Sequence, residues 1–138
     1  MATKQVAAGA VVYDSSRKKF LLLKHRLGNW AFAQGKKEGR EKLETTLSRE
    51  LKEETGLSII ESFGPVCEVL YSFRVRKKKI EKKVVFWAVL TDGEVVLSSE
   101  HLGYIWVSYK QALRLVKFEN HVRALQESYS VLRKEGLV

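Results

Sequence analysis

Three glutamates near the middle of the chain are spaced so that their side chains can act together. Glu53 and Glu54 follow Glu50 by three and four residues, and residues at those separations are neighbours on the surface of a helix. Carboxylate oxygens are the hard ligands that Mg²⁺ prefers, so the three side chains can share one or more divalent cations. The alternative is a solvated acidic helix whose charges form ordinary surface pairs.

The segment that carries these glutamates is predicted to form a helix. Residues 41–55 contain no Gly or Pro and are rich in strong helix formers, and Gly56 stands where a C-terminal cap is expected. At about 100° per residue, Glu50 and Glu54 fall on the face that carries the leucines, and Glu53 falls at its edge. Burying two carboxylates side by side is unfavourable unless a basic group or a cation compensates them.

The spacing of residues around this helix resembles the Nudix box. Gly35 is followed after five residues by Glu41 and, after seven more, by the run Arg-Glu-Leu-Lys-Glu-Glu-Thr-Gly-Leu over residues 49–57. This order agrees with the motif at every defined position. The resemblance implies an α+β Nudix fold, an αβα sandwich with a central mixed sheet.

The resemblance also implies an activity and a set of site residues. Nudix enzymes hydrolyse a nucleoside diphosphate linked to another group and use Mg²⁺ or Mn²⁺, so the chain is expected to act on phosphoric anhydrides. The family's metal ligands fall on the backbone carbonyl of Gly35 and on the carboxylates of Glu50, Glu53 and Glu54. Arg49 takes the place of the orienting residue and Glu41 that of a supporting carboxylate.

A later segment resembles one subgroup of the family, the diadenosine tetraphosphate hydrolases. Residues 97–106 read Leu-Ser-Ser-Glu-His-Leu-Gly-Tyr-Ile-Trp, and in those enzymes the acidic residue at the position of Glu100 is a candidate metal ligand or general base. The alternative is a surface loop in which Glu100 and His101 are solvated. His25 and His121 show no spacing typical of zinc sites or catalytic triads, and we assign them no role.

Substrate contacts are expected from two further regions. Immediately before the box, Gln34 stands at a position where Gln occurs in several polyphosphate-acting members, and Lys36 lies two residues further on. Just before the box glutamate, Arg40 replaces a usual glycine, which predicts a rearranged loop. Residues 74–83 contain seven basic residues in ten and are predicted to form a hairpin tip, either solvated or holding a polyphosphate or RNA backbone. By resemblance, Lys82 and Lys83 would contact phosphates, and Tyr71 or Phe73 would stack on adenine.

The rest of the chain is predicted to supply a sheet and C-terminal helices within one domain, residues 1–138. Strands are expected at residues 6–13, 20–23, 30–33, 57–60, 66–75, 84–90 and 104–107. The first two of these form a hairpin. From residue 110 onward the pattern is helical, with apolar residues recurring at three- and four-residue intervals.

Composition narrows the setting and the partners. The chain has 138 residues, a net charge of +9 and a single cysteine, which favours polyanionic partners and a reducing, cytoplasmic location. No apolar run reaches the ~20 residues that a membrane helix needs. The sequence leaves the oligomeric state open.

These observations lead to one functional hypothesis and several alternatives. The first is Mg²⁺-dependent, asymmetrical hydrolysis of diadenosine tetraphosphate to ATP and AMP. Within the enzymes, the alternatives are an RNA 5′ pyrophosphohydrolase and a pyrophosphatase of ADP-ribose or nucleoside triphosphates. Outside them, the alternative is a Nudix-fold module that binds RNA or nucleotides without catalysis, against which the complete set of glutamates argues.

Overall fold

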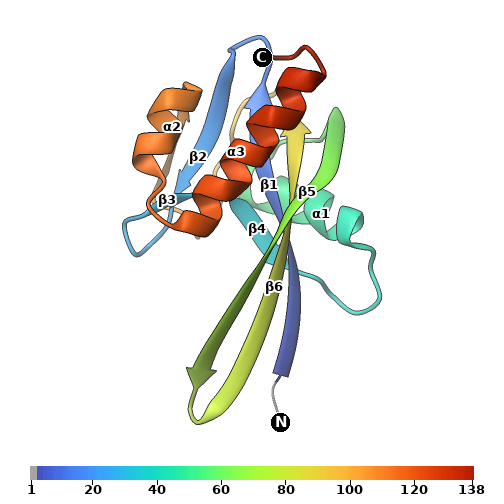
Figure 1. Cartoon of the computed structure of the whole chain (residues 1–138), viewed down its shortest axis with the longest axis vertical. Helices are drawn as coiled ribbons and strands as arrows, with labels where there is room; N and C mark the ends of the chain where they lie inside the picture. Colours follow the sequence, from blue (N-terminus) through green and yellow to red (C-terminus); the bar gives the residue numbers. More distant parts are fainter. Residues whose placement is uncertain (1–2) are drawn as a thin grey trace.

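A seven-stranded mixed sheet, with β1 at its centre, organises the computed structural model, which describes residues 3–138 (Figure 1). β1 (Thr3–Asp14) runs parallel to β6 (Lys78–Leu90) and antiparallel to β2 (Lys19–Lys24) and β4 (Ala33–Lys36). β5 (Glu61–Val75) pairs with β6 at the edge of the sheet, and β3 (Trp30–Ala31) and β7 (Gly103–Val107) pair with β2.

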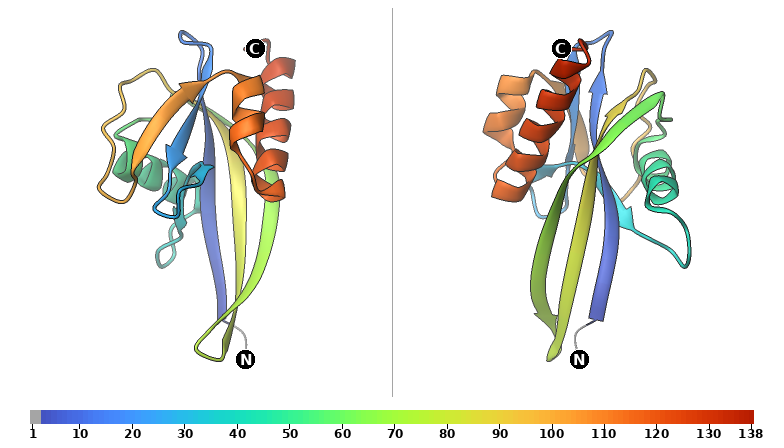
Figure 2. Two further views of the ribbon diagram at one scale, coloured as in Figure 1. Left: turned by 90° about the vertical axis from the view of Figure 1, so that its left-hand side faces the viewer. Right: turned by 45° about the vertical axis from the view of Figure 1, so that its right-hand side comes forward.

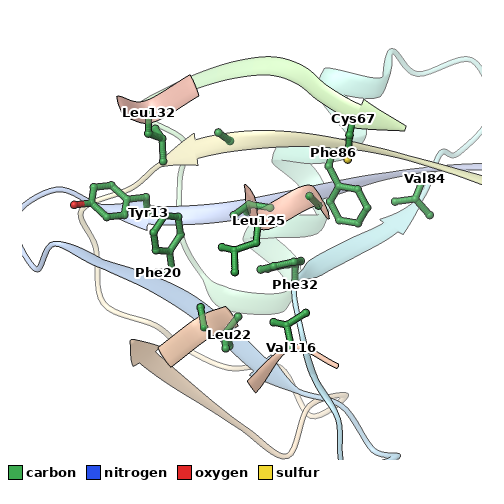
Figure 3. Close-up of a cluster of buried hydrophobic side chains, with 14 of the residues drawn as sticks. Tyr13, Phe20, Leu22, Phe32, Cys67, Val84, Phe86, Val116, Leu125 and Leu132 are labelled. Carbon is green, nitrogen blue, oxygen red and sulfur yellow. The ribbon is translucent and has the colours of Figure 1, made fainter. Parts of the chain in front are cut away.

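Helices cover both faces of this sheet (Figure 2). α1 (Leu43–Thr55) lies on one face, and α2 (Tyr109–Leu115) and α3 (Glu119–Lys134) lie on the other. Because side chains alternate along a strand, β1 sends Val12 toward α1 and Val11 toward α3, and each joins a separate buried cluster. The α3-side cluster includes Phe20, Phe86 and Leu125 (Figure 3). The αβα sandwich implied by the resemblance is confirmed.

Most of the predicted elements are present, and two differ. Residues 57–60 form no strand, because Leu57 turns into the core beneath α1 after the left-handed Gly56, and β5 begins only at Glu61. The predicted strand 30–33 is interrupted at the buried Phe32, and the second piece, β4, continues to Lys36 beside β1. Both differences arise from tertiary packing, which overrides local strand preference.

The β5–β6 hairpin and the start of β1 project beyond the helices (Figure 1). We call residues 70–83 the arm. Its turn lies at Arg76 and Lys77, which both have positive φ, so the hairpin tip predicted within residues 74–83 is observed. Among residues 3–138, no helix combines the length and apolar character needed to cross a membrane.

Candidate active site

The site is built around α1, whose end is fixed by a left-handed cap. Gly56 has φ 73° and its N–H donates to the carbonyl of Lys52 at 2.9 Å, as expected of a glycine that ends a helix. The loop before β7 then docks on this end, because the N–H groups of Val96 and Ser98 donate to the carbonyls of Thr55 and Glu54. This docking brings Glu100 to the glutamates of the helix.

Arg49 forms the centre of an ionic network at the start of the site. Its Nε and Nη2 donate to the two oxygens of Glu41 at 3.2 and 2.6 Å, and its Nη1 donates to Oε1 of Glu50 at 2.8 Å. Nη2 also donates to the carbonyl of Lys36 at 3.0 Å. Hydrogen bonds from Arg49 are the main reason that the pKa of Glu41 falls to about 2. The paired arrangement fixes both the guanidinium and the Glu50 carboxylate.

The three helix glutamates differ strongly in burial, in the order that the helix geometry predicts. The side chain of Glu53 is 58% exposed and that of Glu50 is 17% exposed, whereas Glu54 as a residue is only 4% exposed. Burial, followed by the charges of Glu50 and Glu100, raises the pKa of Glu54 to about 8. Burial also raises the pKa of Glu50, against the opposing effect of Arg49.

These carboxylates line a cavity of about 590 Å³. Its wall consists of residues from β4, the following loop, α1, β6 and the loop before β7: Gln34, Gly35, Lys36, Lys37, Glu38, Glu50, Glu53, Glu54, Lys82, Ser98 and Glu100. Gly35 is required by close approach, because a β-carbon there would collide with the Glu50 carboxylate. The cavity thus joins five carboxylates to three lysines, a composition suited to a cation and an anionic substrate together.

The donor set of the cavity fits a divalent cation. Within residues 3–138 the acidic and histidine side chains do not yet converge as a closed ligand cluster, and Arg49 holds one oxygen of Glu50. However, Oε2 of Glu54 is buried and has no hydrogen-bond partner, and such an atom is costly unless something pairs with it. Glu50, Glu53, Glu54, Glu100 and the Gly35 carbonyl supply the hard oxygen ligands that Mg²⁺ or Mn²⁺ takes.

Of the residues predicted to contact substrate, some line the cavity and others do not. Gln34, Lys36 and Lys82 line the cavity, and the backbone of Gln34 acts to lower the pKa of Glu54, against the larger effect of burial. Lys83, the neighbour of Lys82 on β6, is absent from the cavity wall and by strand alternation faces the other side of the sheet. Tyr71 pairs with Lys82 across β5 and β6 but does not line the cavity.

The loop between β4 and α1, which contains Arg40, holds the Glu41 carboxylate by hydrogen bonds. Gly39 adopts a positive φ of 53°, and the N–H of Glu41 donates to the carbonyl of Glu38. The hydroxyl of Thr46 in turn donates to Glu41 at 2.7 Å. The turn therefore presents the Glu41 carboxylate to Arg49.

Sequence reasoning did not predict where the three histidines lie relative to this cavity. Nε2 of His101 lies 3.3 Å from Oε1 of Glu54, and the only sequence signal for it was its position next to Glu100. His25 and His121 line a second cavity of about 430 Å³, which shares Gln34 and Glu100 with the first. Its residues come from segments that are distant in the sequence, so no local pattern indicates it.

Comparisons with known proteins agree with this fold and site. The NUDIX domain family matches residues 3–127, and the chain therefore belongs to the NUDIX family. It is a hydrolase of phosphoric anhydride bonds rather than a non-catalytic module. Similar proteins include the asymmetrical bis(5′-nucleosyl)-tetraphosphatases of Rattus norvegicus and Mus musculus, which are 35% and 36% identical over 130 residues, 86% of this chain and 84% of theirs.

Solved structures give the same fold. The C. elegans Ap4A hydrolase binary complex matches with a TM-score of 0.73 and 22% identity over 94% of this chain and 98% of that one. The NUDIX domain of Shewanella oneidensis NrtR, complexed with ADP ribose, matches with a TM-score of 0.76 and 18% identity over 96% of this chain and 90% of that one.

Proposed function

We propose that the chain is a bis(5′-nucleosyl)-tetraphosphatase of the asymmetrical type, which converts diadenosine tetraphosphate to ATP and AMP with Mg²⁺ or Mn²⁺. The observation that carries the proposal is the cavity that joins Glu50, Glu53, Glu54 and Glu100 to Lys36 and Lys82. It is supported by identity of about a third to mammalian enzymes of that name over most of the chain.

The residues of the cavity divide the work between substrate and water. Lys36 and Lys82 lie close enough for the charge of Lys36 to lower the pKa of Lys82, after the larger effect of burial, and two cations held together are suited to a polyphosphate chain. Arg49 holds the Glu50 carboxylate in place. A carboxylate of the cavity accepts the proton of the attacking water.

A divalent cation bound by Glu50, Glu53, Glu54, Glu100 and the Gly35 carbonyl would neutralise phosphate oxygens and lower the pKa of a bound water. The second cavity offers a place for one nucleoside, because Gln34 and Glu100 form part of both walls. Phe118 on its rim is largely exposed, and an exposed aromatic face can stack on a base. Tyr71 and Phe73 remain predicted stacking residues.

A second candidate, removal of pyrophosphate from RNA 5′ ends, is favoured by the arm. The arm is exposed and rich in Lys and Arg, and its Lys82 lines the catalytic cavity. A basic strand surface that leads to the site of hydrolysis suits a substrate with a phosphodiester chain attached. A cytoplasmic location stays a prediction from the sequence.

A substrate panel tests the proposal. Purified protein is assayed with Mg²⁺ on diadenosine tetraphosphate, 5′-triphosphorylated RNA, ADP-ribose and a nucleoside triphosphate, and the products are separated by chromatography. We expect the highest kcat/KM on diadenosine tetraphosphate, with ATP and AMP in equal amounts. Faster turnover of the RNA would replace the proposal with the second candidate, and two ADP molecules as products would contradict asymmetrical cleavage.

A further inference from the structure

The ring of His101 lies against the buried carboxylate of the site. Its Nε2 atom lies 3.3 Å from Oε1 of Glu54, and the residue is only 8% exposed. Oε2 of Glu54 and Nδ1 of His101 are buried without hydrogen-bond partners. The contact between Nε2 and Oε1 therefore leaves the second carboxylate oxygen and the second ring nitrogen without partners.

The segment that carries His101 is anchored on both sides. Before it, the N–H of Ser98 donates to the carbonyl of Glu54 at 3.0 Å; after it, the N–H of Leu102 donates to the carbonyl of Lys24 at 2.9 Å. The ring of His25 packs edge-on against that of His101, with centroids 4.8 Å apart. The imidazole is therefore held against Glu54 by the fold.

This arrangement adds nothing evident to stability. A buried polar atom without a partner costs free energy, and the pair contains two such atoms, one on the ring and one on the carboxylate. An apolar side chain at position 101 would remove the ring atom and keep most of the packing. The contact is therefore better explained by what it does to the carboxylate than by what it adds to the core.

We propose that His101 is a positioning residue for Glu54: by holding Oε1 it fixes the carboxylate and keeps Oε2 available as a ligand for a divalent cation. The inference rests on the proposed cation-dependent function. A histidine that orients a ligating carboxylate acts as an outer-sphere partner, and loss of such partners weakens metal binding by about 10- to 100-fold. No sequence motif used above assigns this role to His101.

Three substitutions at position 101 separate positioning from packing. Mn²⁺ binding to the full-length protein is measured by electron paramagnetic resonance at one pH, without nucleotide. His101→Gln places an amide nitrogen near the position of Nε2, whereas His101→Asn places it near Nδ1 and His101→Leu removes the donor. We expect His101→Leu and His101→Asn to weaken Mn²⁺ binding about tenfold or more, and His101→Gln to bind Mn²⁺ within about threefold of the wild type.

Thermal unfolding of the metal-free proteins is the second readout. His101→Leu is expected to unfold at or above the wild-type temperature, since it removes the unpaired Nδ1. The control is Ser128→Ala on α3, which removes another buried side-chain atom without a hydrogen-bond partner and lies outside both cavities. We expect it to bind Mn²⁺ with wild-type affinity.

The outcomes separate this inference from the proposed function. If the wild type binds no Mn²⁺, the proposed function and the inference both fail. If the wild type binds Mn²⁺ and His101→Leu binds it equally well, or Ser128→Ala is as impaired as His101→Leu, only the positioning role is wrong. If His101→Leu fails to fold, the Mn²⁺ affinities of His101→Gln and His101→Asn are compared instead. Equal affinities of these two variants would overturn the inference.

Discussion

The two ends of the α1 site shift the pKa of a glutamate side chain in opposite directions. At the network around Arg49, hydrogen bonds from the guanidinium lower the pKa of Glu41 to about 2. At the other end, burial and neighbouring carboxylates raise the pKa of Glu54 to about 8. The protein supplies its own cation to Glu41, whereas the groups around Glu54 include two further carboxylates, Glu50 and Glu100.

This difference distinguishes a structural carboxylate from one that awaits a ligand. A paired carboxylate stabilises the fold at neutral pH, and a buried unpaired one destabilises it. The second arrangement is favourable only when a bound charge offsets the burial, and divalent cations bind where hard oxygen ligands are held apart from competing positive groups. The comparison therefore supports the proposal that Glu54 binds the cation, with Glu41 in a supporting position.

The largest expected effect is that of Glu54→Gln. Removing the buried charge eliminates a cation ligand, so kcat should fall by several orders of magnitude in the steady-state assay. The same change relieves the burial of a charged group, so the metal-free variant should be more stable than the wild type to urea at pH 8.5. A less stable variant at that pH would contradict the view that Glu54 is an uncompensated carboxylate.

Glu41→Gln is the matched substitution at the other end, and its expected effects on stability have the opposite sign. It leaves the Arg49 guanidinium without its two-point partner, so the variant should be less stable than the wild type at neutral pH. Its kcat should fall less than that of Glu54→Gln, because Glu41 does not line the cavity. Equal losses of kcat in Glu41→Gln and Glu54→Gln would contradict the different roles proposed for the two carboxylates.

The pH dependence of stability is expected to follow from the raised pKa of Glu54. Between its ordinary value of 4.5 and about 8, the folded chain holds a proton that the unfolded chain has released. Stability falls with rising pH where the folded state binds more protons, so the metal-free protein should lose stability as pH rises through this range, and Glu54→Gln should lose less.

A second buried group, His121, affects which pH range is informative in this experiment. Burial lowers the pKa of His121 to about 4, which makes stability rise with pH up to about 6.5, so the effect of Glu54 is read most clearly between pH 7 and 9. Mg²⁺ should raise the melting temperature more at pH 8.5 than at pH 6, because the cation competes with the Glu54 proton. An equal gain at both pH values would contradict this competition.

The smallest expected effect concerns the protein's own cations on the substrate side. Lys82→Ala should raise KM severalfold with little change in kcat, since Lys82 lines the cavity beside Lys36. Lys83→Ala is the matched control on the same strand and should change KM less, because Lys83 is not in the cavity wall. If the two variants have the same KM, then only general charge attracts the substrate.

Local features of the sequence were sufficient for much of the site. Helical periodicity placed Glu54 on the buried side of α1 and Glu53 at its exposed edge, as the structure has them. The same reasoning is wrong for residues 57–60, a short segment predicted to form a strand. These residues form no strand, because Leu57 packs into the core. Periodicity describes how a segment meets a surface and does not say which partner lies there.

The arrangement of the glutamates on α1 could be predicted from the sequence alone, because spacing along a helix fixes the direction of each side chain without reference to the rest of the chain. In contrast, two contacts follow from the folded chain and not from any local pattern: Lys82 rather than Lys83 lines the cavity, and His101 lies against the carboxylate of Glu54. These contacts depend on sheet register and on the docking of a loop against a helix end. Both are set by interactions between segments that are far apart in the chain.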